Sequence, residues 1–166
     1  MTIIVAENKA TTKVYSSFTI ESPADKAFTK PGVEELLTSM LHEAALQEEA
    51  GISFSDKGGN LATNIAGFEY SLNAFSNTIR NPFNERIFEK AKSDLVESVA
   101  SNTKYYADQI NEAAVQSLTL DDVKAFYKSA MKPAKSTLTI VGNITPAEAK
   151  FFAKKAFEDW NTANFS

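Results

Sequence analysis

The spacing of apolar residues changes along this chain, and the order of those changes restricts its fold more than any other feature. Strands are predicted over 2–6, which is short and apolar, and over 13–20, which alternates, and strand character returns, interrupted by turns, over 52–76. A helix is predicted between them, because apolar residues recur at helical spacing from Val33 to Ala44. Strands that come in runs favour an antiparallel or mixed sheet over a doubly wound one. The predicted class is therefore α+β, with helices packed on one face of the sheet.

The second half of the chain predicts mostly helices. Asn81-Pro82 is expected to open a helix that continues to about residue 99, and a weaker helix covers about 104–116. Thr119 and Thr145 each begin a capping-box pattern, with an acidic residue three positions later. These boxes predict two helices that flank a strand at Ser136–Gly142.

The run over 52–76 contains a predicted hairpin and a predicted edge strand. Gly58-Gly59-Asn60 is expected to turn between strands at 52–55 and 61–65. The stretch 68–75 alternates, with Phe68, Tyr70 and Leu72 on one side. We expect these residues to form an edge strand that can bind an extended peptide through main-chain hydrogen bonds.

Composition excludes several classes of function. A net charge of −4 with no long run of Lys or Arg argues against nucleic-acid binding. The lack of cysteine excludes disulfides, thiol catalysis and Cys-based zinc sites. The N-terminus does not resemble a signal peptide, and no apolar run approaches the ~20 residues of a membrane helix. We expect a soluble domain whose compartment the sequence leaves undetermined.

The last third carries a family resemblance. Leu118–Tyr127, Met131-Lys132-Pro133 and Ser136–Ala149 resemble the pitrilysin/insulinase metallopeptidases. In that family this stretch is a helix, a strand ending in Gly, and a helix opened by Pro. The resemblance implies one pitrilysin-like domain over 1–166. Whether that domain is excised from a larger two-domain protein or trimmed stays open.

A second stretch aligns with the helix that carries the family's inverted zinc motif. Gly32–Leu41 matches the scaffold positions without a gap, but not the chemical ones. Glu35 and Ser39 stand where the two zinc-binding histidines would be, and Thr38 where the general-base glutamate would be. The resemblance puts the third ligand near Glu97. It therefore implies no catalytic residue, no bound metal and no cofactor in this chain.

Helical spacing supports the same conclusion. Two ligands on one helix must lie three or four residues apart, and the neighbours of Glu35 at that spacing are Thr38 and Ser39. His42-Glu43 begins like a His-Glu-x-x-His motif, but Leu46 takes the place of the second histidine. Glu35 and His42 are roughly 10 Å apart along a helix, too far to share one ion.

These observations predict a noncatalytic peptidase-like domain. It would support a peptide-binding chamber or pair with a homologous catalytic zinc-peptidase domain or subunit. One alternative is an active metallopeptidase that holds zinc through an atypical set such as Glu35 with Glu97. Another is a structural subunit-interface module with no peptide role. Tyr105-Tyr106 is a further candidate contact for a partner.

Overall fold

The computed structural model describes residues 1–21, 29–55 and 58–161, and these residues contain a five-stranded mixed sheet. The strand order is β1-β5-β2-β4-β3. Neighbouring strands are antiparallel except for β1 and β5, which are parallel. The bounds are β1 Thr2–Glu7, β2 Lys13–Ile20, β3 Ile52–Ser55, β4 Gly58–Asn64 and β5 Ser136–Gly142.

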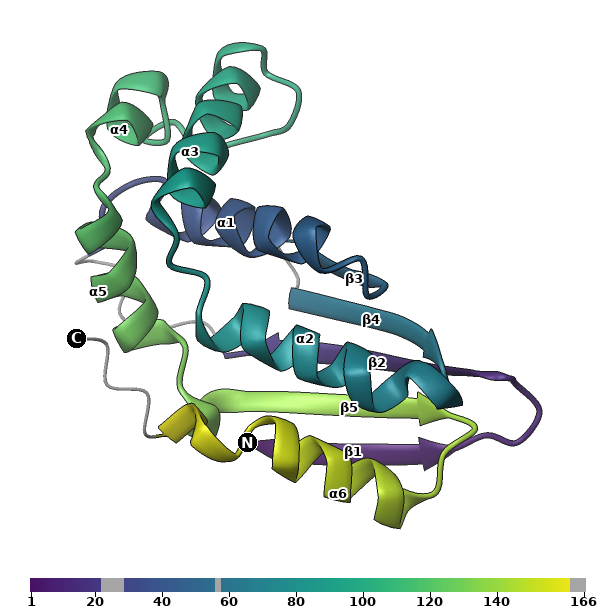
Figure 1. The fold of residues 1–166 in the computed structure, drawn as a ribbon. Coiled ribbons are helices and arrows are strands. Elements are labelled where there is room, and N and C mark those ends of the chain that lie inside the picture. Colours follow the sequence, from purple (N-terminus) through teal and green to yellow (C-terminus); the bar gives the residue numbers. More distant parts are fainter. Residues whose placement is uncertain (22–28, 56–57, 162–166) are drawn as a thin grey trace.

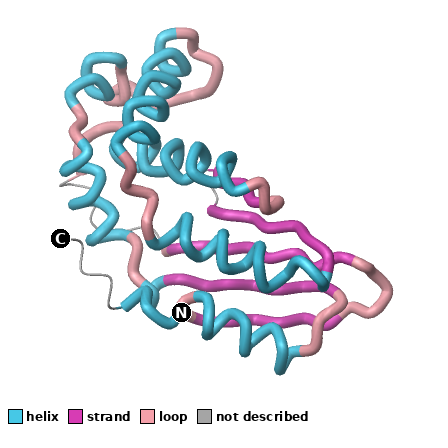
Figure 2. Tube along the Cα trace, viewed as in Figure 1, coloured by secondary structure: helices cyan, strands magenta, loops and turns pink. Residues whose placement is uncertain are grey.

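Helices cover one face of this sheet (Figures 1 and 2). They are α1 Val33–Glu48, α2 Phe68–Arg80, α3 Glu85–Ala100, α4 Glu112–Ser117, α5 Leu120–Ala130 and α6 Pro146–Ala156. In Figure 1, α2 and α6 lie side by side over the sheet, while α3 and α4 project beyond α1. The predicted α+β class with helices on one face is confirmed. Within the described ranges, no helix has the length and apolar composition needed to cross a membrane.

The core lies between the sheet and these helices, as the exposure along β5 illustrates. Leu138 and Ile140 are 0% exposed, whereas Val141 is 37% exposed. Successive side chains of a strand point to opposite faces, so one face of the sheet is packed and the other is open.

The predicted edge strand at 68–75 is wrong, because these residues begin α2. In a strand, Phe68, Tyr70 and Leu72 would share one face. Phe68 and Leu72 are instead fully buried, while Tyr70 is 65% exposed. The longer apolar series through Phe75 and Ile79, both fully buried, has the helical period. An eight-residue window was too short to separate the two periods.

The predicted turn at Gly58–Asn60 is also wrong, because these residues belong to β4. Residues 56–57, which connect β3 to β4, lie outside the described residues. Gly59 is needed because two aromatic rings pack against its backbone. A Cβ there would lie 2.6 Å from the ring of Phe54 and 2.7 Å from that of Phe75. Any larger residue would push these rings apart.

Two helices start later than predicted, while both capping boxes are confirmed. The α3 helix begins at Glu85, because the Asn84 side chain accepts hydrogen bonds from two backbone N–H groups of its first turn. The helix predicted over about 104–116 is shortened to α4, which Asn111 caps. Thr119 and Thr145 cap α5 and α6 with their acidic partners.

The buried hydroxyl of Tyr127 forms hydrogen bonds between helices that pack on the sheet. Its hydroxyl donates to the carbonyl of Ile79 at 2.8 Å and accepts from the indole N–H of Trp160 at 3.2 Å. Burial raises the pKa of Tyr127 to about 12. One phenol thus joins the end of α2, the middle of α5 and the turn after α6.

Candidate functional site

The α1 helix has two chemically different faces. One face packs into the core through Val33, Leu36, Leu37, Met40, Leu41 and Ala45. The other face carries Glu35, Thr38, Ser39 and His42. At its start, Gly32 has a positive φ of 85°, and a Cβ there would lie 3.2 Å from Val115. This glycine lets α1 begin close to α4.

The polar face of α1 lines a cavity of about 290 Å³. The wall comes from four parts of the chain: α1, the end of β3, α3, and the loop between α3 and α4. Its residues are Glu35, Thr38, Ser39, His42, Glu43, Phe54, Ser55, Ala91, Asp94, Leu95, Lys104 and Tyr106. The four polar residues that the sequence placed on this face therefore share one cavity.

Lys90 balances two of the carboxylates in the cavity wall. Its ammonium pairs with Asp94 on its own helix and lies 4.0 Å from Glu43 of α1. The hydrogen bond that it donates to Asp94 raises the pKa of Lys90. The pair links α3 to α1 and occupies oxygens that a cation in the cavity would otherwise use.

The loop wall is held by Tyr106. Its hydroxyl shares a hydrogen bond of 2.7 Å with Ser98 of α3, and the Lys104 ammonium lies 5.4 Å from the centre of its ring. Tyr106 is half-buried, whereas Tyr105 is 90% exposed. The two tyrosines that the sequence singled out as a pair thus have different surroundings.

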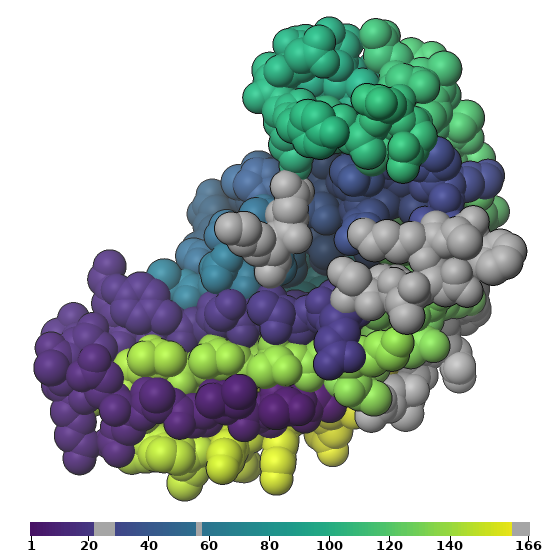
Figure 3. Space-filling model, turned by 180° about the vertical axis from the view of Figure 1, so that it is seen from behind, coloured from purple at the N-terminus to yellow at the C-terminus, as the bar shows by residue number. Residues whose placement is uncertain are grey.

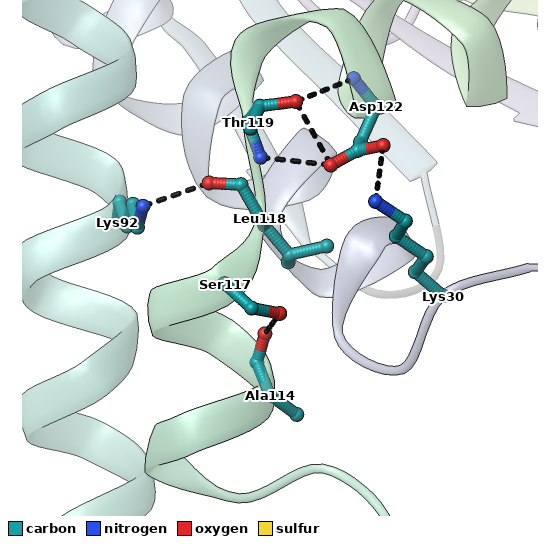
Figure 4. Close-up of polar contacts among 7 residues, drawn as sticks. All are labelled: Lys30, Lys92, Ala114, Ser117, Leu118, Thr119 and Asp122. Carbon is teal, nitrogen blue, oxygen red and sulfur yellow. Dashed lines mark hydrogen bonds and ion pairs between the residues drawn. The ribbon is translucent and has the colours of Figure 1, made fainter.

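A polar junction at the start of α1 sets its position against α5 (Figure 4). Lys30 pairs with Asp122 at 2.7 Å, and the capping-box bonds from Thr119 reach the same carboxylate. The hydrogen bond from Lys30 lowers the pKa of Asp122. Lys92 of α3 donates to the carbonyl of Leu118 at 2.7 Å. The starts of α1 and α5 and the middle of α3 are therefore joined near one point.

A smaller cavity of about 110 Å³ lies between α1, the sheet and α5. Thr38, Phe54 and Ser55 line both cavities, so α1 and the end of β3 separate them. The wall of the smaller cavity is mostly apolar, with Leu37 and Phe126 among its residues. Thr38 also donates to the carbonyl of Glu34 at 3.1 Å, a common helical arrangement for threonine.

Glu97, near which the resemblance puts the third ligand, is not among the residues that line the cavity. Asp94, three residues before Glu97, supplies the acidic group from α3 that lines the cavity. Sequence reasoning also missed Lys104 and the end of β3 as parts of the wall. Neither has a local pattern that marks it, because only the fold brings it to α1.

The described residues around the cavity of about 290 Å³ do not form a metal-binding set. In the part of the chain that the structure describes, no group of three His, Cys, Asp or Glu side chains is placed to hold a metal ion. Zinc in proteins normally requires three or four such ligands.

Comparison with known proteins adds to this geometry. The family model described as the peptidase M16 inactive domain matches residues 117–165. The fold also matches a peptidase M16 inactive domain from Pseudomonas fluorescens, with a TM-score of 0.76 and 16% identity over 93% of this chain. The chain has an M16 peptidase fold. The resemblance to pitrilysin-type peptidases, inferred from the C-terminal third and the Gly32–Leu41 helix, is thereby confirmed.

Two further structural similarities are to longer chains. Pitrilysin matches with a TM-score of 0.65 and 16% identity, covering 99% of this chain and 21% of pitrilysin. A chain of Complex III from Candida albicans matches with a TM-score of 0.69 and 13% identity, covering 93% of this chain and 43% of that one. The Pseudomonas protein is covered to 47%. This chain thus spans about half or less of their lengths. Curated protein sequences give no significant match.

Proposed function

We propose that this chain is a noncatalytic M16-type domain that pairs with a homologous domain and helps to form a peptide-binding chamber. The observation that carries the proposal is the polar face of α1. We take Glu35, Thr38 and Ser39 to stand at the positions of the family's ligands and general base, and this assignment is supported by their lining one cavity beside β3. That residues 1–166 form one such domain stays a prediction.

The charges around the cavity support a noncatalytic role. The Lys90 ammonium pairs with Asp94 and lies 4.0 Å from Glu43, so its positive charge opposes the binding of a metal ion beside these carboxylates. The side chains one turn from Glu35 toward the C-terminus are hydroxyls, which are poor zinc ligands. His42, the histidine of α1, lies on its exposed side. The described residues around the cavity therefore do not supply the metal ligands that would activate a water molecule.

The free edge of β3 is the proposed peptide surface, in place of the residues at 68–75. β3 is the last strand of the sheet and pairs with β4 alone among the described strands. Its residues Phe54 and Ser55 line the cavity next to α1. A peptide added along this edge would use main-chain hydrogen bonds and pass the cavity mouth.

Metal content and activity test the noncatalytic part. The purified chain is dialysed against zinc, its metal is measured by mass spectrometry, and cleavage of quenched fluorescent peptides is followed. We expect no stoichiometric zinc and no cleavage. One equivalent of zinc that is lost in Glu35→Ala would overturn the proposal.

Hydrogen exchange tests the peptide surface. A short unstructured peptide is added, and amide protection is compared between β3 and β1, the strand at the opposite edge of the sheet. We expect protection at β3, and its loss when alternate amides of the peptide are methylated. Protection at β1 alone would place peptide binding elsewhere.

A structural subunit-interface role is the second candidate, because one matching chain comes from Complex III. Under this alternative the chain would still join a larger assembly, but peptide would protect neither edge strand. The hydrogen-exchange experiment therefore separates the two candidates.

A further inference from the structure

The smaller cavity, of about 110 Å³, lies on the other side of α1 from the larger one. Its wall comes from α1, the ends of β2 and β3, the start of β4 and the end of α5. Figure 3, seen from behind Figure 1, shows β2 and α1 reaching the surface on the same side of the molecule. The pairing and the peptide surface proposed above do not involve this cavity.

The inner wall of the smaller cavity consists of buried apolar side chains. Their exposed fractions lie between 2% and 8%, and they include Phe18, Leu37, Leu41, Phe54, Phe126 and Met131. Such a wall offers no hydrogen bonds, so water gains little by entering the space that it encloses. An apolar group that enters is removed from water and gains contacts with the surrounding side chains.

The mouth of the smaller cavity is polar, in contrast to its inner wall. Glu34 and Ser55 line the cavity and are exposed, and Thr38 is half-buried. The Thr38 hydroxyl donates to the carbonyl of Glu34, and its oxygen retains the capacity to accept a hydrogen bond. Among the described residues of the wall, Glu34 is the charged one. The mouth therefore favours a cationic head that donates hydrogen bonds and disfavours an anionic one.

We infer that the smaller cavity binds a small amine with a compact apolar body. A closed apolar cavity of about 150 Å³ holds one benzene molecule. A cavity of about 110 Å³ that opens at a polar mouth accordingly accepts one ring or a short branched chain, with the amine at the mouth. A long acyl chain exceeds this volume, and its carboxylate would face Glu34. The inference does not depend on the proposed function.

Two probes with the same ring and opposite charges test this assignment. Benzylamine and benzoate are each titrated into the chain, which is labelled with ¹³C at its methionine methyl groups. The chain has three methionines, and Met131 lines the smaller cavity whereas Met1 does not. Benzylamine should shift the Met131 signal with a dissociation constant on the order of 1 mM and leave the Met1 signal in place. Benzoate should bind more weakly, by about fivefold or more.

A cavity-filling variant locates the ligand. Ala130, which is 4% exposed, lines the smaller cavity, so Ala130→Leu places a branched side chain inside it. The dissociation constant of benzylamine should rise by about tenfold or more. Ala147→Leu, at an exposed position of α6, is the matched control and should leave it unchanged. Circular dichroism checks that both variants fold.

A variant at the mouth tests the charge preference separately. Glu34 is exposed, so Glu34→Gln should fold even if Ala130→Leu does not. It should weaken the binding of benzylamine and reduce the difference between benzylamine and benzoate.

Each contrary outcome overturns a stated part of the inference. Equal binding of benzylamine and benzoate would overturn the preference for an amine. Binding that Ala130→Leu leaves unchanged, in a folded variant, would place the ligand outside the smaller cavity. No shift of the Met131 signal with either probe would show that the cavity is a packing gap without a ligand, and the proposed function would still stand.

Discussion

The two faces of α1 have the same length and backbone but different relations to the M16 fold. The buried face has a continuous apolar spacing, and Leu36 and Met40 are both fully buried. The opposite face is polar and presents Glu35, Thr38 and Ser39 to the cavity. Packing of the buried face therefore places this helix.

This difference predicts that the fold depends on the buried face far more than on the polar face. A buried leucine contacts many neighbours, and its removal leaves a cavity that the structure cannot fully close. A half-buried hydroxyl on the wall of a water-accessible cavity has few such contacts. Substitutions on the two faces should thus differ strongly in their effect on stability.

The largest effect is expected from Leu36→Ala on the buried face. The free energy of unfolding should fall by about 2–5 kcal/mol, measured by urea denaturation. Leu46→Ala is the matched control, because Leu46 is on the same helix but 57% exposed, and its cost should stay within about 0.5 kcal/mol. Equal costs for the two variants would show that burial does not set the position of α1.

Metal ligands introduced on the polar face should make the stability of the fold depend on zinc. The triple variant Glu35→His, Thr38→Glu and Ser39→His places two imidazoles four residues apart on the cavity wall, near Asp94. If zinc binds only the folded state, a hundredfold excess over Kd stabilises it by about 2.7 kcal/mol. Thermal unfolding with zinc and with a chelator measures this gain.

The control for that variant omits Ser39→His and so leaves one introduced imidazole. It should gain little from zinc. If the triple variant gains no more than this control, α3 does not deliver a third ligand to the cavity.

A smaller effect is expected where α1 meets α5. The pKa of Asp122 is lowered in the folded chain, so its contribution to stability is present above its unfolded pKa and is lost as pH falls through the folded value. The Lys30 ammonium is largely exposed, so solvent screens the pair, and Asp122→Asn should cost about 0.5–1 kcal/mol at neutral pH.

Denaturation as a function of pH checks this sign. The difference between Asp122→Asn and the unaltered chain should vanish in strong acid. Asp121→Asn, at a side chain 94% exposed, should show no comparable dependence. A difference that persists in acid would mean that the charge of Asp122 is not its source.

The smallest effect is expected on the polar face itself. Ser39→Ala should change the free energy of unfolding by no more than about 0.5 kcal/mol, because the hydroxyl lies on the cavity wall and is only half-buried. A cost close to that of Leu36→Ala would contradict the contrast between the two faces.

Local sequence patterns were sufficient to predict several elements of this protein. The apolar stripe of α1 and the capping boxes at Thr119 and Thr145 each act within a few residues, so their physics is complete in the sequence. The same holds for the mismatch at Glu35, Thr38 and Ser39, because helical spacing alone tells which side chains can meet. The strand predicted at 68–75 was wrong, because this short alternation fits a strand as well as a helix, and only burial against the sheet selects the helix.

Contacts between distant segments were decided only by the tertiary structure. Asp94, Lys104 and the end of β3 reach the cavity because α3, its following loop and the sheet pack around α1. The smaller cavity exists only once β2, β3 and β4 pair and α5 packs against α1. The sequence by itself determined the helix whose polar face lines the cavity, while packing determined what surrounds that helix and which sheet face stays open.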